Sequence, residues 1–268
     1  MKRKFGINCD FAHDADPVWK LENIKSAGFD AFFTGPKEPE VIRNLRNRAD
    51  EFGLDFEFIH APFKNINSMW LEGDDYKGIF DGMCNSIDQA SENGVPTVIV
   101  HTSSGWKGPA ICDLGLSRFD ALVDYADKKS VTVAFENLRM IGNTAYMVER
   151  YEDRDNVRFC YDVGHEHCYT KTVVWPDIFC HKIIATHIHD NLGRGWGYEK
   201  GTDLHLLPFD GTVDYRRMIS KLNEYEYKGS LMLEVFSDRH ERYQGLSVDE
   251  FLNTCFERLT RIEKLGEI

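Results

Sequence analysis

Acidic and histidine side chains follow predicted strands at six places in the chain. The stretch Val157–Asp162 has strand character and ends on a carboxylate, and His165 follows one short turn later. A carboxylate at the end of an apolar strand is costly to bury without a partner, and a divalent metal is the most direct partner. The other runs that end in this way are Phe56–His60, Thr97–His101, Val131–Glu136, Ile184–His187 and Ser230–Glu234. Six such strand ends in one chain predict one shared site.

Four of these residues form the expected metal site. They come from the fifth to eighth predicted strands and are Glu136, Asp162, His187 and Glu234. Three carboxylates in one low-dielectric site would repel each other, so either some are protonated or a cation holds them. Three oxygen donors and one imidazole suit Mn²⁺, Mg²⁺, Co²⁺ or Fe²⁺ and also accept Zn²⁺. A carboxylate satisfied by an arginine or a backbone amide is a fair alternative for any one residue, but a weak one for all four.

A second set of residues is expected near the same site, as additional metal ligands or as contacts to substrate or loop backbone. Its members are His60, His101, His165, Asp203 and His205. His189 lies two residues after His187 and should share its side of the strand, and we expect His187 to be the inward ligand. Asp190 is a candidate to orient an imidazole by accepting its N–H.

Substrate contacts are expected from the loops that follow the strands. His165, Arg194 and Trp106 are the candidates, with Arg139 as a further arginine able to hold an anionic or hydroxyl-rich ligand. Trp106 could shield a polar substrate from water, or could equally anchor its own loop.

The elements that must position these residues alternate between strand and helix patterns. Eight strand signals are separated by helical periodicity, for example over 39–52 and 248–265, which predicts a parallel sheet. We expect an α/β fold with a single (β/α)₈ TIM barrel over residues 1–268, rather than an open doubly wound sheet. Strands over 183–189 and 230–236, a poor helix over 172–181 and a long loop over 190–214 are also predicted. In such barrels the active site lies at the carboxyl ends of the strands, where the candidate ligands lie.

Composition restricts the class of protein. The net charge of −12 and the lack of a strong Lys/Arg cluster make a nucleic-acid partner unlikely. No apolar run approaches the roughly 20 residues of a membrane helix, and the basic start lacks the apolar core of a signal peptide. Seven cysteines without a C-x-x-C pair favour a reducing, cytoplasmic location. A homo-oligomer is compatible with the sequence.

Short motifs along nearly the whole chain resemble the xylose isomerase-like TIM-barrel superfamily, which contains sugar isomerases and epimerases and the metal-dependent apurinic endonucleases. The motifs are Ile59–Phe63, Phe135–Asn137, Tyr161–His165, Thr186–Asn191 and Asp203–Asp214. The resemblance implies that the four expected ligands form the single metal site of the ketose 3-epimerases, in which the residue matching His165 contacts substrate. The same four residues and the second set also match the three-metal cluster of the endonucleases. Phe209 departs from the pattern, because glycine is usual there.

This resemblance favours a divalent-metal-dependent isomerase or epimerase that acts on a small sugar, polyol or hydroxy-ketone. Glu136 and Glu234 would be the acid/base pair, and the metal would stabilise an enediolate. A dehydratase of the inosose type is a close variant. The main rival is a metal-dependent phosphodiesterase of the apurinic endonuclease type, and a sugar-binding protein without catalysis is a third class. The acidic net charge argues against the phosphodiesterase.

Overall fold

Eight parallel strands form the centre of the structure, a computed structural model that describes residues 3–12, 15–170, 172–195 and 203–267. The sheet order is β7-β6-β5-β4-β3-β2-β1-β8, so consecutive strands from β1 to β7 pair with one another and β1 also pairs with β8. The strands are β1 (Phe5–Asn8), β2 (Ala31–Thr34), β3 (Asp55–His60), β4 (Thr97–Val100), β5 (Thr132–Glu136), β6 (Val157–Asp162), β7 (Ile183–His187) and β8 (Leu231–Leu233). This is the predicted barrel.

The ring closes between β7 and β8 through a short contact. Ile188 forms a parallel bridge with Leu233: the Ile188 amide donates to the Met232 carbonyl at 2.8 Å, and the Glu234 amide donates to the Ile188 carbonyl at 3.0 Å. Both strands end earlier than predicted, because this contact continues the ladder for only one residue.

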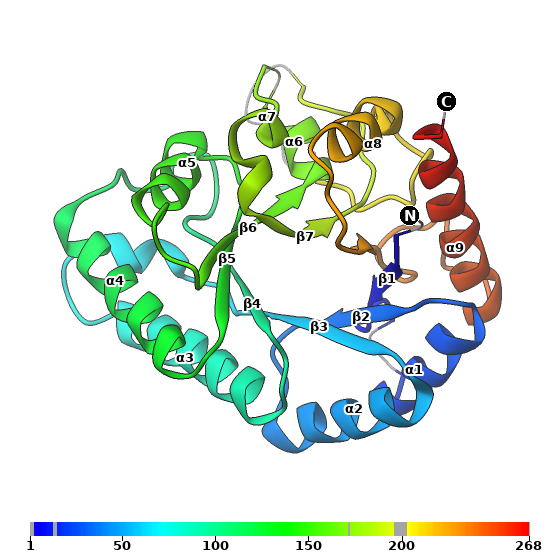
Figure 1. The fold of residues 1–268 in the computed structure, drawn as a ribbon, viewed down its shortest axis with the longest axis horizontal. Helices are drawn as coiled ribbons and strands as arrows, with labels where there is room; N and C mark the ends of the chain where they lie inside the picture. The colour runs from blue at the N-terminus through cyan, green and yellow to red at the C-terminus, as the bar shows by residue number, and fades with distance from the viewer. Residues whose placement is uncertain (1–2, 13–14, 171, 196–202, 268) are drawn as a thin grey trace.

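Helices surround the strands on the outside of the ring (Figure 1). They are α1 (Pro17–Ser26), α2 (Pro39–Phe52), α3 (Tyr76–Glu92), α4 (Asp113–Lys128), α5 (Ile141–Arg150), α6 (Val163–Tyr169), α7 (Trp175–Phe179), α8 (Tyr215–Glu224) and α9 (Val248–Leu265), with 3₁₀ turns at Ile66–Trp70 and Cys180–Lys182. The ranges predicted for α2 and α9 are confirmed to the residue. The weak pattern over 172–181 becomes α7 and the second 3₁₀ turn.

Local sequence sets several of these boundaries. Pro17 begins α1, and the Asp16 carboxylate caps the helix by accepting from the Val18 and Trp19 amides. Gly53 ends α2 in the left-handed conformation at φ 63°. Ser247 forms a capping box that starts α9. Helix α6 was not predicted, since its few residues directly after Asp162 are too short to show a periodic pattern.

Two apolar layers hold the barrel together. The larger lies between strands and helices, and the smaller fills the ring with side chains that include Phe33, Phe58 and Met232. Phe33 and Phe58 stack at 4.6 Å, and Phe33 also stacks on His187 at 5.1 Å. The barrel interior therefore forms an apolar floor directly beneath the expected metal ligands.

Two further sequence expectations concern cysteines and membranes. All seven cysteines are free thiols. Among the described residues, no helix is both long and apolar enough to cross a bilayer.

Candidate metal centre

The predicted ligands meet at one end of the barrel because parallel strands share their direction. His60, Glu136, Asp162 and His187 are the last residues of β3, β5, β6 and β7. His101 and Glu234 directly follow β4 and β8, so they reach the same opening. His165 lies in the first turn of α6, while Asp203 and His205 come from the loop after β7. The nine residues sort into three groups whose ligand atoms lie within 4.8 Å of one another.

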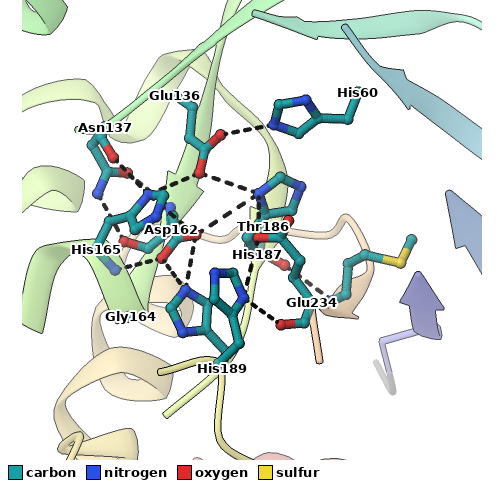
Figure 2. A network of polar contacts seen from close by, with 12 residues as sticks. His60, Glu136, Asn137, Asp162, Gly164, His165, Thr186, His187, His189 and Glu234 are labelled. Atoms are coloured by element: carbon teal, nitrogen blue, oxygen red, sulfur yellow. Dashed lines mark hydrogen bonds and ion pairs between the residues drawn. The ribbon is translucent and has the colours of Figure 1, made fainter. Parts of the chain in front are cut away.

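The central group consists of the four residues expected to bind a metal. The His187 Nδ1 atom is its hub: it lies 3.3 Å from Glu136 Oε1, 3.5 Å from Glu234 Oε2 and 3.8 Å from Asp162 Oδ2. His187 is fully buried, and so are Glu136 and Asp162. Figure 2 shows the three carboxylates gathered around this imidazole.

The second group joins His60 and His101 to Glu136. Glu136 Oε2 lies 2.9 Å from His101 Nε2 and 3.3 Å from His60 Nε2. Glu136 therefore uses one oxygen in each of two groups, which is the arrangement of a carboxylate able to bridge two cations.

The third group contains His165, Asp203, His205 and also His189. Asp203 is its hub: its oxygens lie 3.3 Å from the Nε2 atoms of His165 and His205 and 3.8 Å from that of His189. The Tyr169 hydroxyl donates to Asp203 at 2.7 Å. The structure thus places His187 in the central group and His189 in a different one.

His189 is held in its group by tight packing. Its ring stacks on His205 at 4.0 Å, and its Nε2 atom lies 3.2 Å from the Asp162 carboxylate. A Cβ atom at Gly164 would overlap the His189 ring. It would lie much closer to the ring than 3.0 Å, the distance under which Cβ contacts essentially do not occur. Glycine at this position is what allows α6 to pass so close to the imidazole.

Electrostatics favour the charged form of both Glu136 and His187. Burial alone would raise the pKa of Glu136, but His187, His101 and His165 lower it well below its usual range. Burial alone would lower the pKa of His187, but Cys160, Glu234 and Glu136 raise it well above its usual value. A bound cation would balance the charge of the same carboxylates.

The hydrogen-bonding of two histidines tests whether the residues fit a metal. His60 Nδ1 lies 2.8 Å from the Ala61 carbonyl, and His205 Nδ1 lies 2.8 Å from the Glu234 carbonyl, so each must donate there. In a neutral ring this leaves an Nε2 lone pair aimed at Glu136 or Asp203, which is repulsive unless a cation or proton lies between. Metal-binding histidines are oriented by such a hydrogen bond, and the donor set fits a divalent ion.

Asp190 has a different role from the one predicted. Its carboxylate accepts from the amides of Asn191, Phe209 and Val213 at 2.8, 2.8 and 3.0 Å, so it organises the long loop. Phe209 occupies the position expected for glycine and adopts φ 73°, a conformation that glycine favours. Its ring lies 5.0 Å from that of Tyr215 and under the Arg261 guanidinium, and this packing offsets the strain.

A cavity of about 160 Å³ lies over the ligands. It is lined by residues of all three groups together with loop residues, and Arg139, Tyr169, Phe236 and Arg239 are among them. A second, more apolar cavity of about 310 Å³ adjoins it, and the two share Phe236 and Arg239.

The three predicted substrate contacts take different places around this cavity. His165 lines it directly. Trp106 is not among the residues that line this cavity, and its ring lies 5.7 Å from that of Tyr169, which does line it. The Arg194 guanidinium lies 5.0 Å from the Trp106 ring, and Arg194 lines a separate cavity near α6 and α8. Of these, only His165 reaches the metal ligands.

Sequence reasoning missed three residues of this site. Asn137 braces the ends of β5 and β6, because its side chain accepts from the Asp162 amide and donates to the Asp162 carbonyl, both at 2.8 Å. Tyr169 lies one helical turn after His165 and stacks on it at 4.8 Å. If a helix had been predicted after Asp162, the four-residue spacing would have placed Tyr169 on the same face as His165. Arg239 follows β8, and its position after a strand was the available signal.

Comparison with known proteins identifies the family. Residues 21–253 match the model of the xylose isomerase-like TIM barrel, so the chain belongs to this family. An uncharacterised protein of Methanocaldococcus jannaschii is 25% identical over 98% of this chain and 94% of its own length. An inosose dehydratase of Glaesserella parasuis is 26% identical over 45% of this chain and 46% of its own length.

Solved structures confirm the fold. A D-tagatose 3-epimerase-like protein is similar with a TM-score of 0.76 and 19% identity, over 98% of both chains. The IolI protein with a bound zinc atom is similar with a TM-score of 0.77 and 18% identity, over 97% of this chain and 98% of that one.

Proposed function

We propose that the protein is a divalent-metal-dependent isomerase or epimerase that acts on a small sugar, polyol or hydroxy-ketone. The central observation is that Glu136 and Glu234 both approach His187 Nδ1, at 3.3 and 3.5 Å, from β5 and β8, which are not adjacent in the sheet. The epimerase-like and zinc-containing structures of the same fold support this class of enzyme.

Glu136, Asp162, His187 and Glu234 would hold the ion. A divalent ion there would polarise a substrate carbonyl and its neighbouring hydroxyl and stabilise an enediolate. Mn²⁺, Mg²⁺, Co²⁺, Fe²⁺ and Zn²⁺ all suit the donor set.

The two glutamates would move the proton. Histidines lower the pKa of both, against the effect of burial, which favours the carboxylate form that a base requires. One would remove the proton next to the carbonyl, and the other, which must first take up a proton from solvent, would give that proton to the opposite face.

Solvent deuterium tests the proton transfer. The protein is incubated in heavy water with ketohexoses, ketopentoses and inosose, with Mn²⁺ or with a chelator. Deuterium should enter the carbon next to a carbonyl, and Glu136→Gln or Glu234→Gln should lower the rate by roughly 10²- to 10⁴-fold. Exchange that survives the chelator, or that persists in both variants, would rule out this pair. An inosose that loses water in the same assay would instead identify a dehydratase.

Metal content tests the ligand assignment. Glu136→Ala and Asp162→Ala should abolish tight binding of the ion and leave a folded barrel. Elemental analysis that finds stoichiometric metal in both variants would overturn the assignment.

A phosphodiesterase of the apurinic endonuclease type is the second candidate. The three ligand groups around one opening, with Glu136 in two of them, are the observation that favours it. Three bound ions per chain together with cleavage of abasic DNA would establish this alternative. One ion, or metal-dependent exchange without DNA cleavage, would support the isomerase.

A further inference from the structure

Two arginines at the active-site cavity differ from most arginines of this acidic protein. With a net charge of −12, carboxylates are plentiful, and most arginines pair with one, as Arg3, Arg150 and Arg217 do. Arg139 and Arg239 both line the cavity, yet no hydrogen bond or ion pair joins either guanidinium to another of the described residues. Neither guanidinium forms an ion pair of its own, although nearby carboxylates, that of Glu234 first among them, act to raise the pKa of Arg239.

Aromatic rings hold both guanidinium groups in place. The Arg139 guanidinium lies 3.9 Å from the centre of the Tyr169 ring, and that of Arg239 lies 3.2 Å from the centre of the Phe236 ring. A planar guanidinium stacked on a ring keeps its N–H edge free and loses little further entropy when it binds a ligand. Burial lowers the pKa of Arg239 despite the opposing effect of Glu234, as expected for a guanidinium that is partly withdrawn from water. Both guanidinium groups are therefore held in place with N–H donors available to a ligand in the cavity.

The positions of the arginines suit a ligand that spans the cavity. Arg139 follows β5 and Arg239 follows β8, so they approach from distant strands. Arg239 lies where the polar cavity meets its apolar neighbour, while the metal ligands form the floor. An anionic group would be attracted to the arginine rim, because Arg139 and Arg239 carry positive charge there. The field therefore orients a charged substrate with its neutral carbonyl end toward the metal site.

We propose that Arg139 and Arg239 bind an anionic group of the substrate, a carboxylate or a phosphate, so that the enzyme acts on a charged sugar rather than on a neutral ketose. This inference rests on the proposed function, because it names the substrate class of the same site. Guanidinium groups match both anions by paired N–H donors.

Matched pairs of compounds test the proposal. Deuterium exchange and turnover are measured for D-ribulose against D-ribulose 5-phosphate, for D-fructose against D-fructose 6-phosphate, and for ketose uronates against the corresponding neutral ketoses. The charged member should have a kcat/KM at least roughly 100-fold higher. Arg139→Gln and Arg239→Gln should each remove about ten- to hundredfold of that preference, mainly through KM, since a hydrogen bond to a charged group is lost. Preference for the phosphate or for the uronate then identifies the anion.

The controls separate anion binding from folding and metal loss. Arg48→Gln changes an exposed arginine on α2 that pairs with Glu51, and it should leave the preference intact. Metal content and thermal unfolding should be unchanged in all three variants. The proposal would be overturned if neutral and charged compounds had the same kcat/KM and if neither cavity variant changed it.

A binding measurement keeps this inference distinct from the proposed function. Inorganic phosphate is titrated calorimetrically into the metal-loaded protein and into the Arg139→Gln/Arg239→Gln double variant. Weaker binding in the double variant supports the anion site, even if no compound shows exchange and the isomerase proposal fails. Equal binding in the two proteins, or none in either, refutes the anion site.

Discussion

Gly164→Ala should displace His189 and destabilise the protein. The added Cβ would overlap the His189 ring, which has no exposed surface and is held between His205 and the Asp162 carboxylate. Ordinary van der Waals contact requires the ring to move by on the order of 1 Å, which would weaken its contact with Asp162. The backbone of α6 can shift little, because Asp162 caps it by accepting from the His165 amide at 2.6 Å.

The size of the effect follows from three contributions. Overpacking costs roughly 1–3 kcal/mol, and a weakened buried hydrogen bond to a charged group costs about 1.5–3 kcal/mol. Replacing glycine by alanine in a helix returns at most about 1 kcal/mol. The net loss should be about 2–4 kcal/mol. At roughly 2–4 °C per kcal/mol, the melting temperature should fall by roughly 5–15 °C.

A double-mutant cycle measured by urea and thermal unfolding isolates the clash. In a His189→Ala background the space is vacated, so Gly164→Ala should cost less than about 0.5 kcal/mol. Gly142→Ala in α5 is the matched control: its added Cβ would meet nothing within 4 Å, and its stability should be unchanged or slightly higher. An equal cost of Gly164→Ala in both backgrounds would refute the packing argument.

Other buried groups give further expectations. Burial raises the pKa of Glu57, so folding disfavours its charged form: the contribution of this group to stability is most favourable at low pH and is lost as pH rises from the unfolded through the folded pKa. Glu57→Gln should therefore raise the melting temperature at pH 7 but not below about pH 4, and an equal effect at both pH values would contradict this. Asn137→Ala should cost roughly 2–4 kcal/mol in urea unfolding, because two hydrogen bonds to the Asp162 backbone are lost. Tyr169→Phe should cost about 1–2 kcal/mol by the same measurement, since its hydroxyl donates to an aspartate, and an unchanged midpoint would count against that role.

The sequence by itself determined the barrel and the end at which its site lies. Alternating strand and helix patterns predict parallel strands, and parallel strands bring their carboxyl ends to one opening. The sequence therefore placed Glu136, Asp162 and His187 at one opening of the barrel. The ranges of α2 and α9 were equally accessible, because proline and a capping box mark their starts and the apolar spacing continues to their ends.

Only the tertiary structure decided how the meeting residues are grouped. Strand alternation places His187 and His189 on one side, but β7 ends at His187 and Ile188 is tied to β8, so the two imidazoles enter different groups. Side chains alternate between the two faces of a strand only while its hydrogen bonds to the neighbouring strand continue. The partner strand determines where these hydrogen bonds stop. Arg239 likewise acquires its role from the ring of Phe236 and from a cavity that it shares with Arg139, 100 residues earlier in the chain. Such contacts depend on side-chain packing between distant segments, which no local pattern records.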